Sequence, residues 1–68
     1  MMNVVFKYRM KVKADSIFDL TNRGYVVNQN DCVEGEFWLL TNSPKYLTSF
    51  VESDGFEVVV AAEEIPMA

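Results

Sequence analysis

The chain has 68 residues, of which 50% are hydrophobic, and a formal net charge of −4 at pH 7. A chain of this length forms one domain and buries only about 60% of the surface that its unfolded form exposes, so its core is small. The apolar content excludes an intrinsically disordered chain, and the excess of ten acidic over six basic residues disfavours nucleic-acid binding.

The compartment is indicated by a single cysteine and by the spacing of the first basic residues. Cys32 is the only cysteine, so the chain cannot form an internal disulfide. Lys7, Arg9 and Lys11 interrupt the first apolar stretch, which therefore does not resemble a signal peptide. No apolar run approaches the ~20 residues of a membrane span. We expect a cytoplasmic protein without membrane contact.

Residues 3–13 alternate between apolar and basic side chains. Successive side chains of a strand point to opposite faces, so this period of two predicts a half-buried β-strand with a basic outer face. The apolar positions are Val4, Phe6, Tyr8, Met10 and Val12, and the basic positions are Lys7, Arg9, Lys11 and Lys13.

A short helix is predicted over residues 16–23. Ser16 and Asp19, three residues apart, resemble a capping box, in which the first side chain accepts a hydrogen bond from the backbone of the first turn. Arg23 in the last turn and Gly24 just after it suit a helix C-terminus.

A second helix is predicted after Asn42. Ser43 suits the N-cap, and Pro44 suits the first helical position, where its missing N–H is not needed. Gly55 ends the helix. The apolar residues that recur at helical spacing within it are Leu47, Phe50 and Val51.

Three further strands complete the pattern. Residues 25–27 begin one strand, and the polar run 28–31 predicts the turn that ends it, because Asn and Asp tolerate left-handed backbone. Residues 33–41 and 56–62 are the other two strands, apolar on both faces at their centres. Residues 63–68 are expected to form a flexible tail.

The element order is therefore β-α-β-β-α-β. Two right-handed crossover units around a central hairpin give a four-stranded antiparallel sheet with both helices on one face, the ferredoxin-like plait of the α+β class. In that topology the strand order is 4-1-3-2, and residues 1–68 form a single domain. Many unrelated functions use this fold, so the fold alone implies none of them.

Several kinds of chemistry are disfavoured by the residues present. The chain has no histidine, the commonest general base and metal ligand. Cys32 has no neighbouring cation to activate it, and no glycine-rich phosphate loop is present. Asp31, Glu34 and Glu36 could hold a cation, but their spacing matches no known metal-binding loop. We expect no catalytic residue, no metal and no cofactor, and therefore no enzyme.

The helices are expected to cover the apolar side of the sheet and to leave the basic row exposed. Glutamates on both neighbouring strands are expected to flank this row, because opposite charges across strands stabilise a sheet. The residues expected under the helices are Phe6, Tyr8, Met10, Phe37, Leu39, Val58 and Val60.

A partner-binding surface is predicted on the opposite side of the sheet, the open face. Trp38, Leu40 and Val59 are expected to form an apolar patch there, and such patches mark interfaces. The predicted partner-binding residues are Lys7, Arg9, Lys11, Glu36, Trp38, Leu40 and Val59.

The preferred function is that of a small regulatory or inhibitory protein that acts by protein–protein contact. Its partner is another protein or a second copy, bound through the open face or the edge of the second strand; accessory proteins of phages and mobile elements that bind host machinery fit this description. One alternative is a single-stranded RNA-binding module, in which Trp38 stacks on a base. Another is a regulatory module that senses a small ligand.

Overall fold

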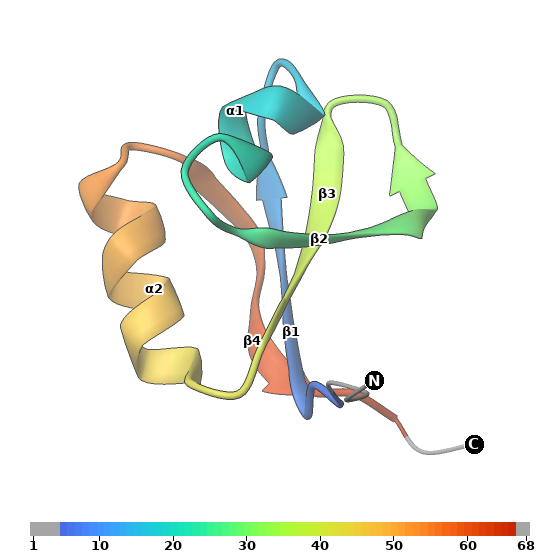
Figure 1. Cartoon of the computed structure of the whole chain (residues 1–68), viewed down its shortest axis with the longest axis vertical. Helices are drawn as coiled ribbons and strands as arrows, with labels where there is room; N and C mark the ends of the chain where they lie inside the picture. Colours follow the sequence, from blue (N-terminus) through green and yellow to red (C-terminus); the bar gives the residue numbers. More distant parts are fainter. Residues whose placement is uncertain (1–4, 67–68) are drawn as a thin grey trace.

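The computed structural model describes residues 5–66, without the side chains of residues 29–32. Within these residues the chain forms strands and helices in the order β-α-β-β-α-β (Figure 1). The elements are β1 (Tyr8–Lys13), α1 (Ile17–Thr21), β2 (Val26–Val33), β3 (Glu36–Thr41), α2 (Pro44–Ser53) and β4 (Glu57–Glu64).

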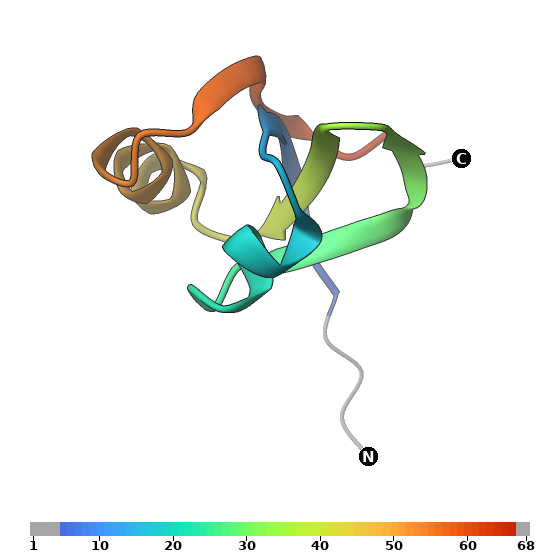
Figure 2. The same ribbon diagram turned by 90° about the horizontal axis from the view of Figure 1, so that it is seen from above.

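The four strands form one antiparallel sheet in the order β2-β3-β1-β4. One face of this sheet packs against both helices, because a single core cluster contains residues of β1, β3, α1 and α2. The helices lie apart, α1 beside β2 and α2 beside β4 (Figure 2). The prediction of an α+β chain with a four-stranded antiparallel sheet and two helices is confirmed. The core residues are Met10, Val12, Leu20, Leu39, Leu47 and Val51.

The first strand has the predicted two-faced character but is shorter than predicted. β1 begins at Tyr8, and residues 5–7 continue from it without regular strand pairing; residues 3–4 lie outside the described part of the chain. The side chain of Asn42 holds this segment, accepting a hydrogen bond from the Lys7 N–H (2.8 Å) and donating one to the Val5 carbonyl (3.1 Å). A side-chain clamp thus replaces strand pairing there.

Both helices are followed by the predicted glycines in the left-handed region, but α1 ends at Thr21, earlier than predicted, and Arg23 lies beyond its last turn. Gly24 has φ 89°, and the Tyr25 N–H donates to the Leu20 carbonyl across it (3.2 Å). Gly55 has φ 82°, and the Phe56 N–H donates to the Val51 carbonyl in the same way (3.1 Å). This pattern satisfies carbonyls that the last turn of a helix leaves unpaired.

The start of each helix is only partly as predicted. The Ser16 hydroxyl accepts a hydrogen bond from the Phe18 N–H (3.2 Å), which confirms Ser16 as an N-cap. Pro44 is the first residue of α2, but the Ser43 side chain makes no capping hydrogen bond. The Ser43 N–H donates instead to the Thr41 hydroxyl (2.9 Å), so the predicted capping role of the Ser43 side chain is wrong.

The predicted turn at residues 28–31 is wrong, because β2 continues through these residues to Val33. The turn lies at Glu34 and Gly35, and Gly35 supplies the positive φ (83°) that a two-residue connection requires. Asn28 pairs with Trp38 and Val33 with Glu36, so four residues of β2 lie opposite one residue of β3. The polar run is therefore a bulge within the strand.

The fourth strand extends further than predicted. β4 runs to Glu64, and the Ile65 N–H then donates to the Lys7 carbonyl (2.8 Å). Glu63 and Glu64 pair with Arg9 and Tyr8, so the predicted tail is wrong for residues 63–65. Residues 67–68 lie outside the described part of the chain.

Irregular pairing along β4 also changes which of its side chains face the helices. Val58 pairs with Val12, but Val60 pairs with Lys11 because the register shifts between these two pairs. Directly paired residues share a face of the sheet, so Val60 lies on the open face and its predicted position under the helices is wrong. The bulge leaves Val59 as the extra residue between the two pairs.

We predict that Leu39→Ala lowers the free energy of unfolding by about 2–5 kcal/mol, because it leaves a cavity at the centre of the core. Val33→Ala, which shortens an exposed side chain, is the control and changes the free energy by less than about 0.5 kcal/mol. Equilibrium unfolding in urea, followed by circular dichroism, measures both. Similar effects of the two substitutions would contradict the described core.

Candidate functional site

The basic row of β1 lies on the open face and is neutralised by glutamates, as predicted. The ion pairs join Arg9 to Glu63 (3.7 Å), Lys11 to Glu36 (3.6 Å) and Lys13 to Glu57 (3.1 Å). Glu36 belongs to β3, and the other two glutamates belong to β4. These residues therefore present little unbalanced positive charge to a partner.

Trp38 is half-buried on this face because two of the same cations cover it. The guanidinium carbon of Arg9 lies 4.3 Å from the centre of the Trp38 ring, and the Lys11 amine lies 4.9 Å from it. Both distances permit attraction between a cation and the ring face. Arg9 Nε is buried without a hydrogen-bond partner in the described part of the chain.

The apolar patch predicted on the open face is correspondingly reduced. Leu40 is half-buried like Trp38. Exposed apolar side chains on this side of the sheet lie at its edge, at Val26 and Val33 in β2. Val59, the bulge residue of β4, is also exposed. Lys7 is exposed but lies before β1. The structure thus brings together Arg9, Lys11, Glu36 and Trp38 of the predicted residues, as a compact charged cover over one ring.

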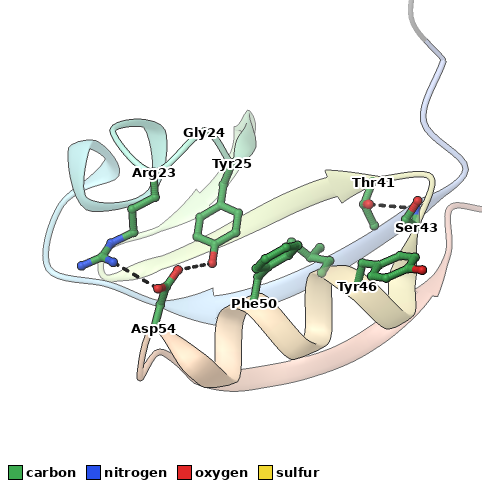
Figure 3. Close-up of a pocket in the computed structure, with 9 residues that line it drawn as sticks. Arg23, Gly24, Tyr25, Thr41, Ser43, Tyr46, Phe50 and Asp54 are labelled. Atoms are coloured by element: carbon green, nitrogen blue, oxygen red, sulfur yellow. Dashed lines mark hydrogen bonds and ion pairs between the residues drawn. The ribbon is translucent and has the colours of Figure 1, made fainter.

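A different surface carries Tyr46 and Phe50, two of the three exposed aromatic residues in the described part of the chain; the third, Phe18, lies on α1. This surface is a groove of about 490 Å³ between α2 and the connection from α1 to β2, which we call the aromatic groove (Figure 3). Its residues are Arg23, Gly24, Tyr25, Thr41, Ser43, Tyr46, Leu47, Phe50 and Asp54.

The wall formed by α2 results from two parallel apolar stripes on one helix. Leu47 and Val51, four residues apart, face the sheet and are buried. Tyr46 and Phe50, also four residues apart, lie about 100° around the helix from them. Their exposed fractions are 71% and 61%, and both rings stand on the groove side of α2 (Figure 3).

One end of the groove is closed by a cluster of interactions around Asp54. Its carboxylate accepts a hydrogen bond from the Tyr25 hydroxyl and forms an ion pair with Arg23 (3.2 Å). The Arg23 guanidinium lies over the Phe56 ring (5.3 Å), and the rings of Tyr25 and Phe56 meet edge to face (6.3 Å). The end of α2 is thereby joined to the end of α1.

This cluster raises the pKa of Tyr25 to about 12. Burial of the phenol is the largest cause, followed by its hydrogen bond to Asp54 and the negative charge of that carboxylate; the nearby Arg23 charge partly opposes the rise. Tyr25 therefore stays protonated at neutral pH and donates its hydrogen bond. The groove combines apolar walls with a neutralised polar end, which suits the binding of apolar side chains.

The acidic residues gather elsewhere. Asp15, Asp19, Glu34 and Glu57 line a second recess of about 440 Å³ at the start of α1. Of the predicted acidic cluster, Glu36 pairs with Lys11, Glu34 is exposed, and the side chain of Asp31, like that of Cys32, lies outside the described set. Within the described residues, no three His, Cys, Asp or Glu side chains are grouped to hold a metal ion.

Comparison with protein-family models, with curated proteins and with solved structures found no match to this chain. In the described part of the chain, neither helix is long and apolar enough to span a membrane. The functional proposals below therefore rest on the contacts and the chemistry of the chain itself.

Sequence reasoning missed the aromatic groove because it assigned Phe50 to the buried stripe of the second helix. A signal for the groove was available in the spacing of four apolar residues in α2. They form two stripes, one of Tyr46 and Phe50 and the other of Leu47 and Val51, and a ten-residue helix on the edge of a sheet buries only one of them.

We predict that Arg9→Ala and Lys11→Ala each increase the quenching of Trp38 fluorescence by acrylamide, because each substitution uncovers the ring. Trp38 is the only tryptophan, so the signal has one source. Lys13→Ala is the control, since the Lys13 amine pairs with Glu57. Equal quenching in all three variants would contradict the described cover over the ring.

We also predict that Tyr25 stabilises the fold in a pH-dependent way. Its folded pKa of about 12 exceeds the ordinary tyrosine value of about 10, so this contribution is complete below pH ~10 and is lost as the pH rises toward 12. The difference in unfolding free energy between the wild type and Tyr25→Phe should shrink over that interval, as measured in urea. Tyr46→Phe is the control, and a difference independent of pH would contradict the prediction.

Proposed function

We propose that this chain is a small non-enzymatic regulatory or inhibitory protein that binds another protein through the aromatic groove and α2. The observation that carries the proposal is the exposure of Tyr46 and Phe50, one turn apart beside the groove. Folded monomers seldom expose neighbouring large aromatic residues, and aromatic residues contribute strongly to protein interfaces.

The ferredoxin-like plait is the fold that we propose for this arrangement. The strand order β2-β3-β1-β4 and the placement of both helices on one face support that assignment. The fold hosts many functions, so the functional proposal depends on the groove. The cytoplasmic location and the origin in a phage or mobile element stay predictions from the sequence.

The partner surface in this proposal differs from the one predicted from the sequence. On the open face, Trp38 is covered by Arg9 and Lys11, and glutamates neutralise both cations. The edge of β2 is also poorly suited to pairing with a partner strand, because it contains a bulge. The α2 side of the domain instead exposes two large aromatic side chains, Tyr46 and Phe50.

Single-stranded RNA binding is less well supported by this geometry. A base would have to displace Arg9 or Lys11 from Trp38 in order to stack on the ring.

Small-ligand sensing remains a second candidate, because a groove of about 490 Å³ falls within the usual range of ligand pockets, about 300–1,000 Å³. Thermal stabilisation by a metabolite panel distinguishes ligand sensing from the main proposal.

Phe50→Ser tests the main proposal. We expect this substitution to reduce capture of a protein partner from the native host by at least about tenfold, the effect of losing a central interface residue. Val33→Ser is the matched control, because Val33 is similarly exposed (59%) but lies at the far end of β2. Quantitative pull-down with the immobilised chain provides the measurement, and circular dichroism checks that both variants fold. Undiminished capture by Phe50→Ser would overturn the proposal.

A further inference from the structure

We propose that a second copy of this chain docks on α2, so that two α2 helices pack antiparallel around a two-fold axis near Thr48 and Ser49. The inference rests on the proposed function, since it assigns a partner to the same aromatic surface. It is carried by the arrangement of aromatic and charged residues on the exposed side of α2.

The exposed side of α2 has the shape of a helix-packing surface. Tyr46, Ser49, Phe50 and Ser53 are all exposed and lie within an arc of about 100° on the helix. The small serines occupy one half of the arc, where a second helix can approach closely. The two rings occupy the other half.

An antiparallel pair brings the rings of the two copies together. In such a pair, two residues lie opposite each other when they are equally far from the axis along their helices but on opposite sides of it. With the axis near residues 48 and 49, Tyr46 lies against the partner's Phe50, and Phe50 lies against the partner's Tyr46. The four rings then cover the mouths of both aromatic grooves and become desolvated, as aromatic residues in interfaces do.

A register half a residue away, a shift of about 0.75 Å along the helix, pairs the charges of α2. Lys45 and Glu52 are its only charged residues, and both are exposed without an ion-pair partner in the described part of the chain. They lie about 20° apart around the helix, on the side of the arc away from the rings. In the antiparallel pair, each Lys45 meets the partner's Glu52.

This charge pattern favours a second copy in one orientation. Lys45 and Glu52 are seven residues apart, about 10.5 Å along the helix, so they do not pair within one chain. A parallel arrangement would place like charges together, which disfavours it. The chain's net charge of −4 does not oppose the contact at α2, since the helix itself carries one positive and one negative charge.

The expected association is weak. α2 has ten residues and is therefore about 15 Å long, so one helix pair buries less than the ~1,200–2,000 Å² of a stable interface. We expect a dimer that forms as the concentration rises, with a dissociation constant on the order of micromolar.

A charge exchange tests the inference. Sedimentation velocity from about 1 to about 500 μM measures the dissociation constant of the wild type and the variants. Lys45→Glu and Glu52→Lys should each weaken the dimer at least about fivefold, because each creates two like-charge pairs. The double variant K45E/E52K restores both attractive pairs and should return to the wild-type value. Phe50→Ser should leave only monomer.

The control variant is Lys7→Glu, which changes the net charge as Lys45→Glu does but at an exposed lysine away from α2. It should leave the dissociation constant unchanged. A wild type that is monomeric at every concentration, or a double variant that stays as weak as the single ones while folded, overturns the inference. If the chain is monomeric but Phe50→Ser still loses capture of a host protein, the inference fails and the proposed function stands. If the dissociation constants of the charge variants change as expected but Phe50→Ser does not reduce capture of a host protein, the inference is supported and the proposed function is overturned.

Discussion

The shortness of α1 is the constraint on which the exposure of Tyr46 and Phe50 depends. α1 has five residues and places only Leu20 in the fully buried core, whereas α2 has ten residues and places two there. Because α1 is too short to pack along α2, the layer above the sheet has a gap between the two helices, and this gap is the aromatic groove. Tyr46 and Phe50 are exposed for this reason: they occupy the side of α2 where a longer helix would lie.

The ends of the two helices compensate in part for the missing helix contact. Each helix closes through a left-handed glycine, and the residue after each glycine is aromatic, Tyr25 in one case and Phe56 in the other. These two rings meet edge to face, and Asp54 connects them electrostatically through Tyr25 and Arg23. The segments that end the two helices therefore contact each other, and this contact closes one end of the groove. At the opposite end of the groove, the Ser43 N–H donates a local hydrogen bond to the Thr41 hydroxyl.

The sequence pattern was sufficient to predict the features that depend on residues close together in the chain. The alternation along β1, the helix-ending glycines and the glutamates beside the basic row were all confirmed. The turn at residues 28–31 was wrong because Asn and Asp favour turns only weakly compared with Gly35, which accepts a positive φ. The orientation of Val60 depends on bulges in β4, and the exposure of Phe50 depends on how much of the sheet α1 covers. Both are long-range properties, because the spacing in α2 defines two apolar stripes without determining which of them is buried.

The remaining surfaces of the sheet are less suited to association than α2. Both edge strands, β2 and β4, are irregular, and an irregular edge resists pairing with another strand. The open face holds its ring beneath two neutralised cations. A second copy and a different protein would therefore both bind where Phe50 is exposed, and each would exclude the other. By mass action, self-association would then lower the fraction of the chain available to a partner as its concentration rises. In that way α2 would make the fraction of the chain that can bind a partner depend on the protein's concentration.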